Sequence, residues 1–224
     1  MKEPWLEPIL RRMRIGRVLP YVKDVPGCRL LDVGCGWEAR LLRELEPHLA
    51  AGWGIDYKAP PIATEKLRTI SARLDDRLPF EDESFDVVTM LAVLEHLDKP
   101  LAILREIARL LRPEGRLLLT VPSRYAKPVL EFLAYRVGIV NPDEIRDHKS
   151  YFNRGDLVRL LAQCEGLAIE QHRYFQCGMN NYLVCRKTSS AGRSLNAPAP
   201  VNLTSSVIRP NDSAARRRSS ISEP

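Results

Sequence analysis

Short apolar runs alternate with stretches of helical periodicity along most of the chain. In residues 100–111 the apolar side chains recur every third or fourth position, which indicates a helix with one buried face. Residues 39–49 show a similar pattern. Four runs have the length of strands: 29–33, 52–56, 85–91 and 116–122. This alternation predicts an α/β fold, a parallel sheet with helices on both faces.

Weaker signals complete the pattern. Residues 112–115 (Arg-Pro-Glu-Gly) are expected to end the helix before the strand at 116–122, and Pro60 and Pro61 to leave only a short helix after the second strand. Asn153, with Asp156 three residues later, predicts a capped helix start. Further strands are expected near 67–74, 167–174 and 181–186, and a mixed insertion at 123–150.

Composition and length bound the class of protein. The chain has 224 residues, of which 45% are hydrophobic, so it can form one soluble globular domain with a sizeable core. No apolar run approaches the ~18 residues of a membrane span, and the start of the chain lacks the apolar stretch of a secretory signal. We therefore expect a cytoplasmic protein.

The cysteines give no evidence of a metal site. There are five of them and no C-x-x-C pair, which argues against a disulfide framework and against structural zinc. We expect five reduced thiols, mostly buried.

The positive charge is concentrated at the end of the chain. Half of the net charge of +6 lies in residues 188–224, where five arginines face two acidic residues. This segment is rich in Ser, Pro, Asn and Ala and is predicted to be a disordered tail. The remaining +3 forms no basic stripe beyond Arg11–Arg17, so no specific nucleic-acid binding is expected.

A glycine loop is the sharpest local feature. Gly34 and Gly36 follow the strand at 29–33 and precede a helix, where glycine allows a tight turn and close approach of a ligand to free amide groups. Asp56 ends the next strand and could accept hydrogen bonds from a ribose. The pattern indicates a nucleotide-like cofactor but also satisfies the loose dinucleotide fingerprint.

The glycine loop is part of one of six motifs that follow one another along the chain. Together they resemble class I S-adenosylmethionine-dependent methyltransferases of the small-molecule, type 11-like kind, over residues 28–187: Leu30–Gly36, Gly54–Asp56, Leu78–Phe80, Ser84–Val88, Leu94–Leu97 and Leu111–Leu119. The resemblance implies a Rossmann-like, seven-stranded, mostly parallel sheet whose last strand is antiparallel. It also implies S-adenosylmethionine (SAM) as cofactor and a small-molecule acceptor.

The resemblance further implies roles for seven cofactor-binding residues: Asp32, Gly34, Gly36, Asp56, Asp75, Asp76 and Leu91. The two glycines would line the methionine part, and Asp56 would bind the ribose. Asp75, with Asp76 as the alternative, would meet the adenine amino group. Asp32 would fix the loop or the cofactor ammonium, and the Leu91 backbone would lie near the methyl. Glu38 departs from the pattern, because many relatives have a third glycine there.

Methyl transfer from a sulfonium mainly requires that the nucleophile and the methyl be held in line, an effect that supplies roughly 7–11 kcal/mol. Neither a nucleophilic residue nor a metal is needed. If the acceptor is a hydroxyl, a general base helps. His96, after the strand at 85–91, is the first candidate, because an imidazole titrates near neutral pH; His148 is the second.

Acceptor recognition is expected in the variable segments. Residues 1–27 carry an amphipathic segment that suits a cap over the site, or alternatively a peripheral membrane anchor, and 128–140 could line a pocket for a lipid-linked acceptor. We expect a sugar, a phenol- or quinone-like compound or another metabolite as acceptor. Two alternatives remain: a catalytically silent cofactor-binding module that regulates a partner, and a nicotinamide-dependent oxidoreductase. The oligomeric state is not predicted.

Overall fold

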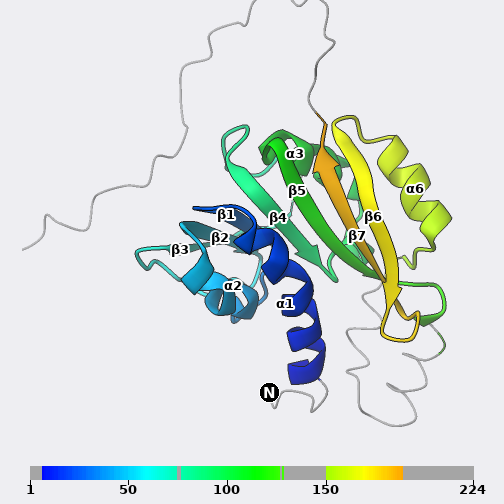
Figure 1. Cartoon of the computed structure of the whole chain (residues 1–224), viewed down its shortest axis with the longest axis horizontal. Helices are drawn as coiled ribbons and strands as arrows, with labels where there is room; N and C mark the ends of the chain where they lie inside the picture. Colours follow the sequence, from blue (N-terminus) through cyan, green and yellow to red (C-terminus); the bar gives the residue numbers. More distant parts are fainter. Residues whose placement is uncertain (1–6, 75–76, 127, 129–149, 189–224) are drawn as a thin grey trace, which may run out of the picture. The chain divides into compact units, whose positions relative to one another are not determined.

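A seven-stranded sheet runs through the centre of the structure (Figure 1), a computed structural model that describes residues 7–74, 77–126, 128 and 150–188. The strands are β1 (Arg29–Val33), β2 (Ala51–Asp56), β3 (Leu67–Ser71), β4 (Phe85–Leu91), β5 (Leu111–Pro122), β6 (Leu167–Phe175) and β7 (Asn180–Lys187). Their order is β3-β2-β1-β4-β5-β7-β6, and β7 runs antiparallel to both of its neighbours. The predicted Rossmann-like sheet with an antiparallel last strand is confirmed.

The strand order reverses between β1 and β4. The chain leaves β1 for β2 on one side, whereas β4 pairs with β1 on the other. A crevice forms at such a switch point, outside the carboxyl ends of the strands, and ligands of open α/β sheets bind there. The fold therefore places a binding site at the ends of β1, β2 and β4.

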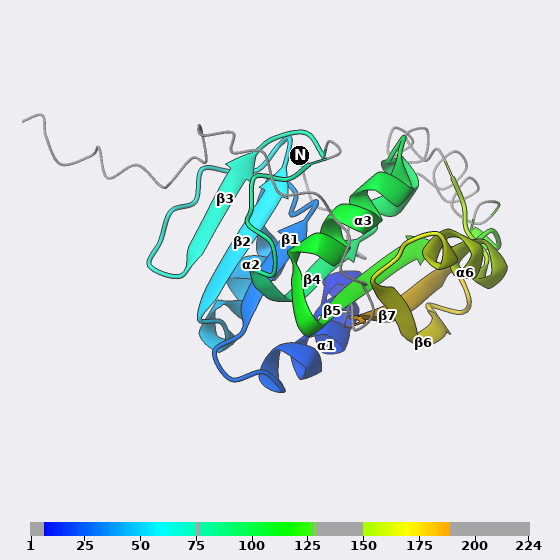
Figure 2. The same cartoon turned by 90° about the horizontal axis from the view of Figure 1, so that it is seen from above.

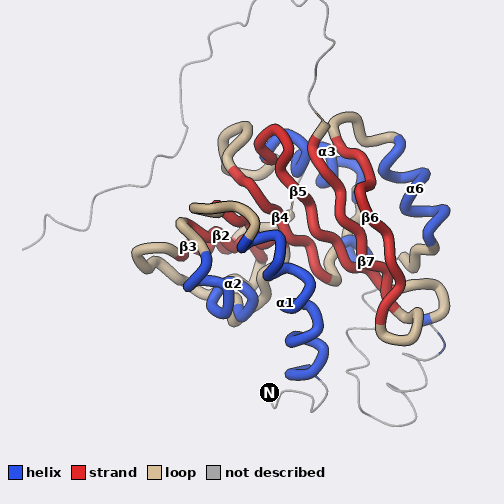
Figure 3. The backbone as a smooth tube through the Cα atoms, in the orientation of Figure 1, coloured by secondary structure: helices blue, strands red, loops and turns tan. Residues whose placement is uncertain are grey.

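Helices cover both faces of the sheet (Figures 1 and 2), as predicted. They are α1 (Glu7–Lys23), α2 (Arg40–Leu45), α3 (Pro100–Leu110) and α6 (Arg154–Ala162), with short 3-10 turns η1 (Glu46–His48) and η2 (Leu94–His96). α1 and α2 share one buried cluster through residues such as Val18 and Leu42, and α3 and α6 share the other through Ile103 and Leu157. The tube in Figure 3 shows the sheet between these helices.

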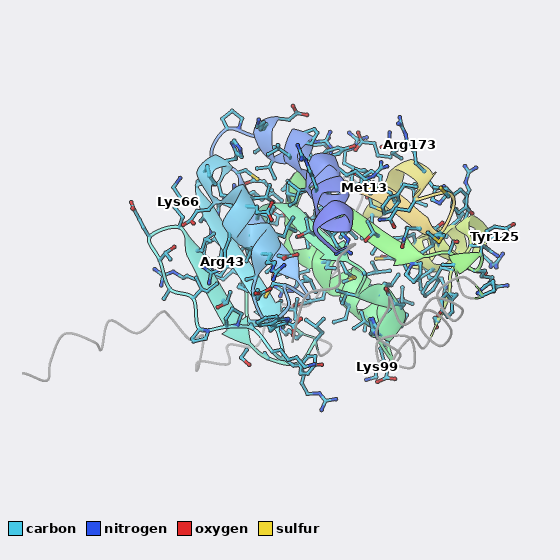
Figure 4. All side chains as sticks on the ribbon, turned by 90° about the horizontal axis from the view of Figure 1, so that it is seen from below. Met13, Arg43, Lys66, Lys99, Tyr125 and Arg173 are labelled. Atoms are coloured by element: carbon cyan, nitrogen blue, oxygen red, sulfur yellow. The ribbon has the colours of Figure 1, made fainter. Side chains whose placement is uncertain are left out.

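The second half of α1 is the part that packs on the sheet. Val18 and Val22 are fully buried, and the Tyr182 hydroxyl donates a hydrogen bond to the Arg17 carbonyl at 3.1 Å. The Arg17 guanidinium lies 4.6 Å from the centroid of the Phe175 ring. Met13, in the first half of the helix, is exposed on the surface (Figure 4). Figure 1 shows that the first turns of α1 lie at the end of the sheet to which the β4 arrow points.

The predicted short helix after the second strand is wrong. Residues 57–66, all of which the structure describes, form no helix, because Pro60 and Pro61 remove backbone donors where a helix would start. The connection instead runs back along β3. There the Thr69 amide donates to the Ile62 carbonyl at 3.0 Å, and Ala63 forms a bridge with Arg68.

The helix at 100–111 and the strand after it are confirmed with one change of boundary. α3 ends at Leu110, and β5 begins at Leu111, five residues before the predicted start. Leu111 pairs with Phe85, and the register then shifts so that Arg116 pairs with Val87. The segment 112–115 therefore forms a bulge in β5, with Glu114 in a left-handed conformation (φ 66°).

The expected burial of most of the cysteines is confirmed. All five cysteines are free; four are buried and Cys177 is exposed. Burial raises the pKa of the Cys28 and Cys35 thiols to about 12, so both stay protonated at neutral pH. None of the helices in the described part of the chain is both long and apolar enough to span a bilayer.

The described residues all belong to one compact unit, Met1–Ser190. The predicted tail (188–224) and insertion (123–150) lie largely outside the described residues, as do the first six residues of the cap. Those three assignments remain predictions.

We predict that Asn153→Ala lowers the free energy of unfolding by about 1 kcal/mol. The Asn153 side chain accepts from the Asp156 amide at 2.9 Å, and the Asp156 carboxylate accepts from the Asn153 amide at 3.0 Å, which is the predicted capping box. Chemical denaturation checks the value. Asn153→Asp keeps an acceptor and should lose only a few tenths of a kcal/mol; equal losses for both variants would contradict the capping role.

Candidate functional site

The loop between β1 and α2 is built from left-handed residues. Gly34, Gly36 and Ala39 have φ values of 79°, 69° and 48°. The Gly34 amide donates to the Ile55 carbonyl at 2.8 Å, which fastens the loop to the end of β2. A Cβ on Gly34 would lie 2.2 Å from a methyl carbon of Val93, in the segment after β4. Only glycine therefore fits here, where three strand ends meet.

Asp56 joins the loop to the end of β2. Its carboxylate accepts from the Gly36 amide at 3.1 Å and from the Lys58 amide at 2.8 Å. An ionised carboxylate has about four lone-pair sites, so acceptor capacity remains for the two hydroxyls of a ribose. The predicted ribose carboxylate thus also holds the glycine loop in place.

Asp32 lies beneath the loop and is almost fully buried. Burial raises its pKa to about 7; the Thr89 hydroxyl, which donates to it at 2.7 Å, opposes the shift, and the nearby negative charge of Asp56 adds to it. The side chain is therefore an internal carboxyl group that changes its charge near neutral pH.

Glu38 does not need to be a glycine in this chain. Its backbone does not have the left-handed conformation that favours glycine, and its carboxylate forms an ion pair with Arg40. The neighbouring Trp37 is 59% exposed. The departure from the family pattern therefore leaves the turn geometry intact, because position 38 does not require a left-handed residue.

The segment after β4 forms the other side of the crevice. Ala92 is left-handed (φ 57°), and its amide donates both to the Thr120 carbonyl at 3.0 Å and to the Thr120 hydroxyl at 3.1 Å. This pins the backbone just after Leu91, where the methyl of the cofactor is expected. His96 follows in η2, partly buried. The structure thus brings Leu91 and His96 to the same edge as the glycine loop.

Glu95, next to His96 in η2, is a buried acid that sequence reasoning missed. It is 1% exposed, and one of its carboxylate oxygens has no hydrogen-bond partner. Burial raises its pKa to about 8, against the opposing effects of its own backbone amide and of the Arg14 charge. In the sequence it is one acid in a short turn, and nothing in the pattern signals that it is buried.

Three of the predicted site residues, Asp75, Asp76 and His148, lie outside the described residues, so their assigned roles remain predictions. Within the described part of the chain, no three His, Cys, Asp or Glu side chains gather in a way that could hold a metal ion.

Comparison with known proteins identifies the chemistry of this crevice. Residues 9–172 match the methyltransferase domain family. The chain belongs to that family. SAM is therefore its cofactor, and the predicted methyltransferase is favoured over the silent module and the oxidoreductase. The glycine loop and the remaining acceptor capacity of Asp56 fit such a cofactor. Apart from the two chain neighbours of Gly36, no atom of the described residues lies within 4 Å of where a Gly36 Cβ would be.

Individual relatives agree with this methyltransferase assignment. The ubiquinone biosynthesis O-methyltransferase of Vibrio campbellii is 26% identical over 164 residues, 68% of this chain and 69% of its own length. That of Neisseria meningitidis is 30% identical over 155 residues, 62% and 64% of the two chains.

Solved structures share the fold. A Haloferax volcanii methyltransferase in complex with the Trm112 activator superposes with a TM-score of 0.64 at 17% identity, over 82% of this chain and 90% of that one. The methyltransferase CalH in complex with SAH (S-adenosylhomocysteine) gives 0.57 at 19% identity, over 78% and 55%.

We predict that the affinity of this methyltransferase for SAM decreases as the pH falls below 7, by up to about tenfold per pH unit. The resemblance implies that Asp32 faces the cofactor ammonium, a cation that favours the ionised carboxylate, so binding below the Asp32 pKa of about 7 should release a proton. Calorimetry in buffers of different ionisation enthalpy measures that proton. SAH carries the same ammonium and should show the same pH dependence. If the affinity of Asp32→Asn for SAM has the same pH dependence as that of the unmodified protein, Asp32 is not the group that titrates.

We predict that Gly34→Ala destabilises the methyltransferase more than Gly36→Ala does. Both variants carry the left-handed strain of about 1–2 kcal/mol, but only the first places a Cβ against Val93. Thermal and chemical denaturation compare the two. Val93→Ala removes the clashing methyls and should restore part of the loss in the double variant; simple additivity of the two changes would contradict the contact.

Proposed function

We propose that this methyltransferase transfers the methyl group of SAM to a hydroxyl oxygen of a small, phenol- or quinone-like acceptor. The names of the relatives support an O-methyltransferase of this kind. The observation that carries the proposal is the contact of Val93 with Gly34, because it sets the turn bearing His96 against the loop that receives the cofactor.

The protein's contribution is mainly positional. SAM would supply a methyl group bound to a positively charged sulfur, and the sulfur is the leaving group when the acceptor oxygen attacks the methyl carbon in line. Gly34, Gly36 and Asp56 hold the donor, and the backbone pinned at Ala92 borders the path of the methyl. His96 takes the hydroxyl proton as the oxygen bonds to the methyl carbon. In this proposal Asp75 or Asp76 meets the adenine, and His148 is the second candidate base.

Residues outside the sheet complete the acceptor site in this proposal. The first turns of α1 lie at the cofactor end of the sheet (Figure 1), which suits the predicted cap. The apolar character of 128–140 suits a hydrophobic or lipid-linked acceptor. Cytoplasmic location and peripheral membrane contact belong to the same proposal.

The test is transfer of labelled methyl from SAM to a panel of phenols, catechols, sugars, amines and carboxylic acids. We expect O-methylated phenols or catechols. Transfer only to nitrogen or carboxylate acceptors would overturn the acceptor class, and tight SAM binding without any transfer would favour the silent module.

We predict that His96→Ala lowers kcat by about 10²-fold to 10⁴-fold while the dissociation constant of SAH stays the same, because the base acts on the acceptor and not on the cofactor. Calorimetry and steady-state kinetics separate the two effects. His48→Ala is the matched control, since this exposed histidine lies in η1, before β2 begins. A normal kcat in His96→Ala would exclude it as the base.

A further inference from the structure

The guanidinium of Arg17, on the sheet side of α1, lies against aromatic rings and has no anionic partner. It is 4.6 Å from the centroid of the Phe175 ring and 5.3 Å from that of Tyr182. Its Nε is buried and has no hydrogen-bond partner among the described residues, and no ion pair of this part of the chain includes Arg17. A charge that is removed from water is costly unless it is paired. This arginine therefore lacks the acceptor that its environment calls for.

The two rings orient the guanidinium and leave its donors unused. A guanidinium is attracted to the faces of aromatic rings, while its N–H donors lie in the plane of the fork. The Tyr182 hydroxyl donates to the Arg17 backbone carbonyl at 3.1 Å, which fixes this turn of α1 above the ring. The planar fork matches the two oxygens of a carboxylate. Because the side chain is only partly buried, such a group can reach it from solvent.

The surrounding charges favour an anion as well. Burial raises the pKa of Tyr182, and the positive charges of Arg17 and Arg173 oppose that shift, so both cations lie near its hydroxyl. Arg173 is exposed on β6. Arg14, one turn earlier on α1, differs from Arg17 because its charge acts on the buried Glu95. Arg17 and Arg173 thus form a positive region in which a carboxylate would balance the unpaired guanidinium.

The sheet connects this region to the methyl end of the crevice. Its register places four residues in one row across β4, β5, β7 and β6: Leu91, Thr120, Tyr182 and Arg173. Residues directly opposite each other in a sheet present their side chains on the same face, and Leu91 and Tyr182 both pack in the cluster under α1. Adjacent strands are about 4.8 Å apart, so the backbones of Leu91 and Tyr182 are separated by about 10 Å. This separation is comparable to the length of a phenolic acid.

We propose that Arg17 binds a carboxylate of the methyl acceptor and so makes this methyltransferase selective for acidic acceptors. The inference rests on the proposed function, in which the reacting hydroxyl lies by Leu91 and His96. In this arrangement the acceptor reaches from His96 to α1, with its acidic end at Arg17. Arg173 adds a second positive charge that attracts the same group.

The experiment compares two phenolic acids of different arm length, para-hydroxybenzoate and para-hydroxyphenylpropanoate, with their neutral amides. Calorimetry measures binding to the protein saturated with SAH, and transfer of labelled methyl from SAM gives KM. We expect at least one acid to bind about tenfold or more tightly than its amide, because only the acid offers a charged acceptor to Arg17.

Arg17→Gln should remove this preference. We expect the dissociation constant and the KM of the acid to rise about tenfold to a hundredfold, whereas those of the amide and the dissociation constant of SAH stay unchanged. Arg17→Lys keeps the charge but lacks the planar fork, so it should restore the preference only in part. A merely structural role of Arg17 would weaken the binding of acid and amide alike.

Arg186→Gln is the matched control. Arg186 lies at the other end of β7 and pairs with Glu114 at 2.7 Å, so this variant loses the same charge away from the proposed site. The preference for the acid should remain. If Arg17→Gln does not fold, the comparison of acid with amide in the unmodified protein and in Arg17→Lys carries the test.

Equal affinity for acid and amide in the unmodified protein, or an equal loss for both in Arg17→Gln, would overturn the carboxylate site. Vesicles of phosphatidylglycerol test a different anion: if Arg17→Gln weakens vesicle binding but not acid binding, Arg17 contacts a membrane surface and the acceptor role fails. The proposed function fails separately. If the acid binds through Arg17 but its hydroxyl is not methylated, the acceptor class is wrong while the carboxylate site stands.

Discussion

The hydrogen bond between the Gly36 amide and the Asp56 carboxylate joins the ends of β1 and β2, and the rest of the site is arranged around it. It fixes the glycine loop before any cofactor arrives. The Gly34 contact with Val93 then sets the segment after β4 against this loop. Because the loop is already fastened, less ordering entropy is lost on binding, which is the advantage of a preorganised site.

Three buried carboxylates of the described chain are accommodated in different ways. Asp32 accepts a hydrogen bond from the Thr89 hydroxyl, and burial raises its pKa to about 7, whereas Glu106, although buried, pairs with Arg109, which lowers its pKa below the usual range. Glu95 has an unpaired oxygen, and burial favours its neutral form. The same residue chemistry thus yields a proton-sensitive group, a permanent anion and a buried acid, depending only on the partners that the fold supplies.

The features readable from the sequence are those set by local rules. The cap of α6 was predictable because its signal, Asn153 and Asp156, lies within four residues. The ends of β1 and β2 were predictable because each follows a short apolar run: Gly34 comes directly after β1, and Asp56 is the last residue of β2. Glu95 and Glu106 escaped prediction because their burial depends on elements far away in the chain. For Glu106 a signal existed, an acid in an apolar helical stripe with an arginine three residues on.

Residues 57–66, which connect β2 to β3 without a helix, also cover the free edge of β3. By returning alongside β3, they occupy the Thr69 amide and the Leu67 carbonyl, two backbone groups on the outer margin of the sheet. An open margin would be a template for a strand from another molecule. By preventing a helix here, Pro60 and Pro61 help to keep the edge strand β3 from pairing with a strand of another molecule, which is a route to aggregation.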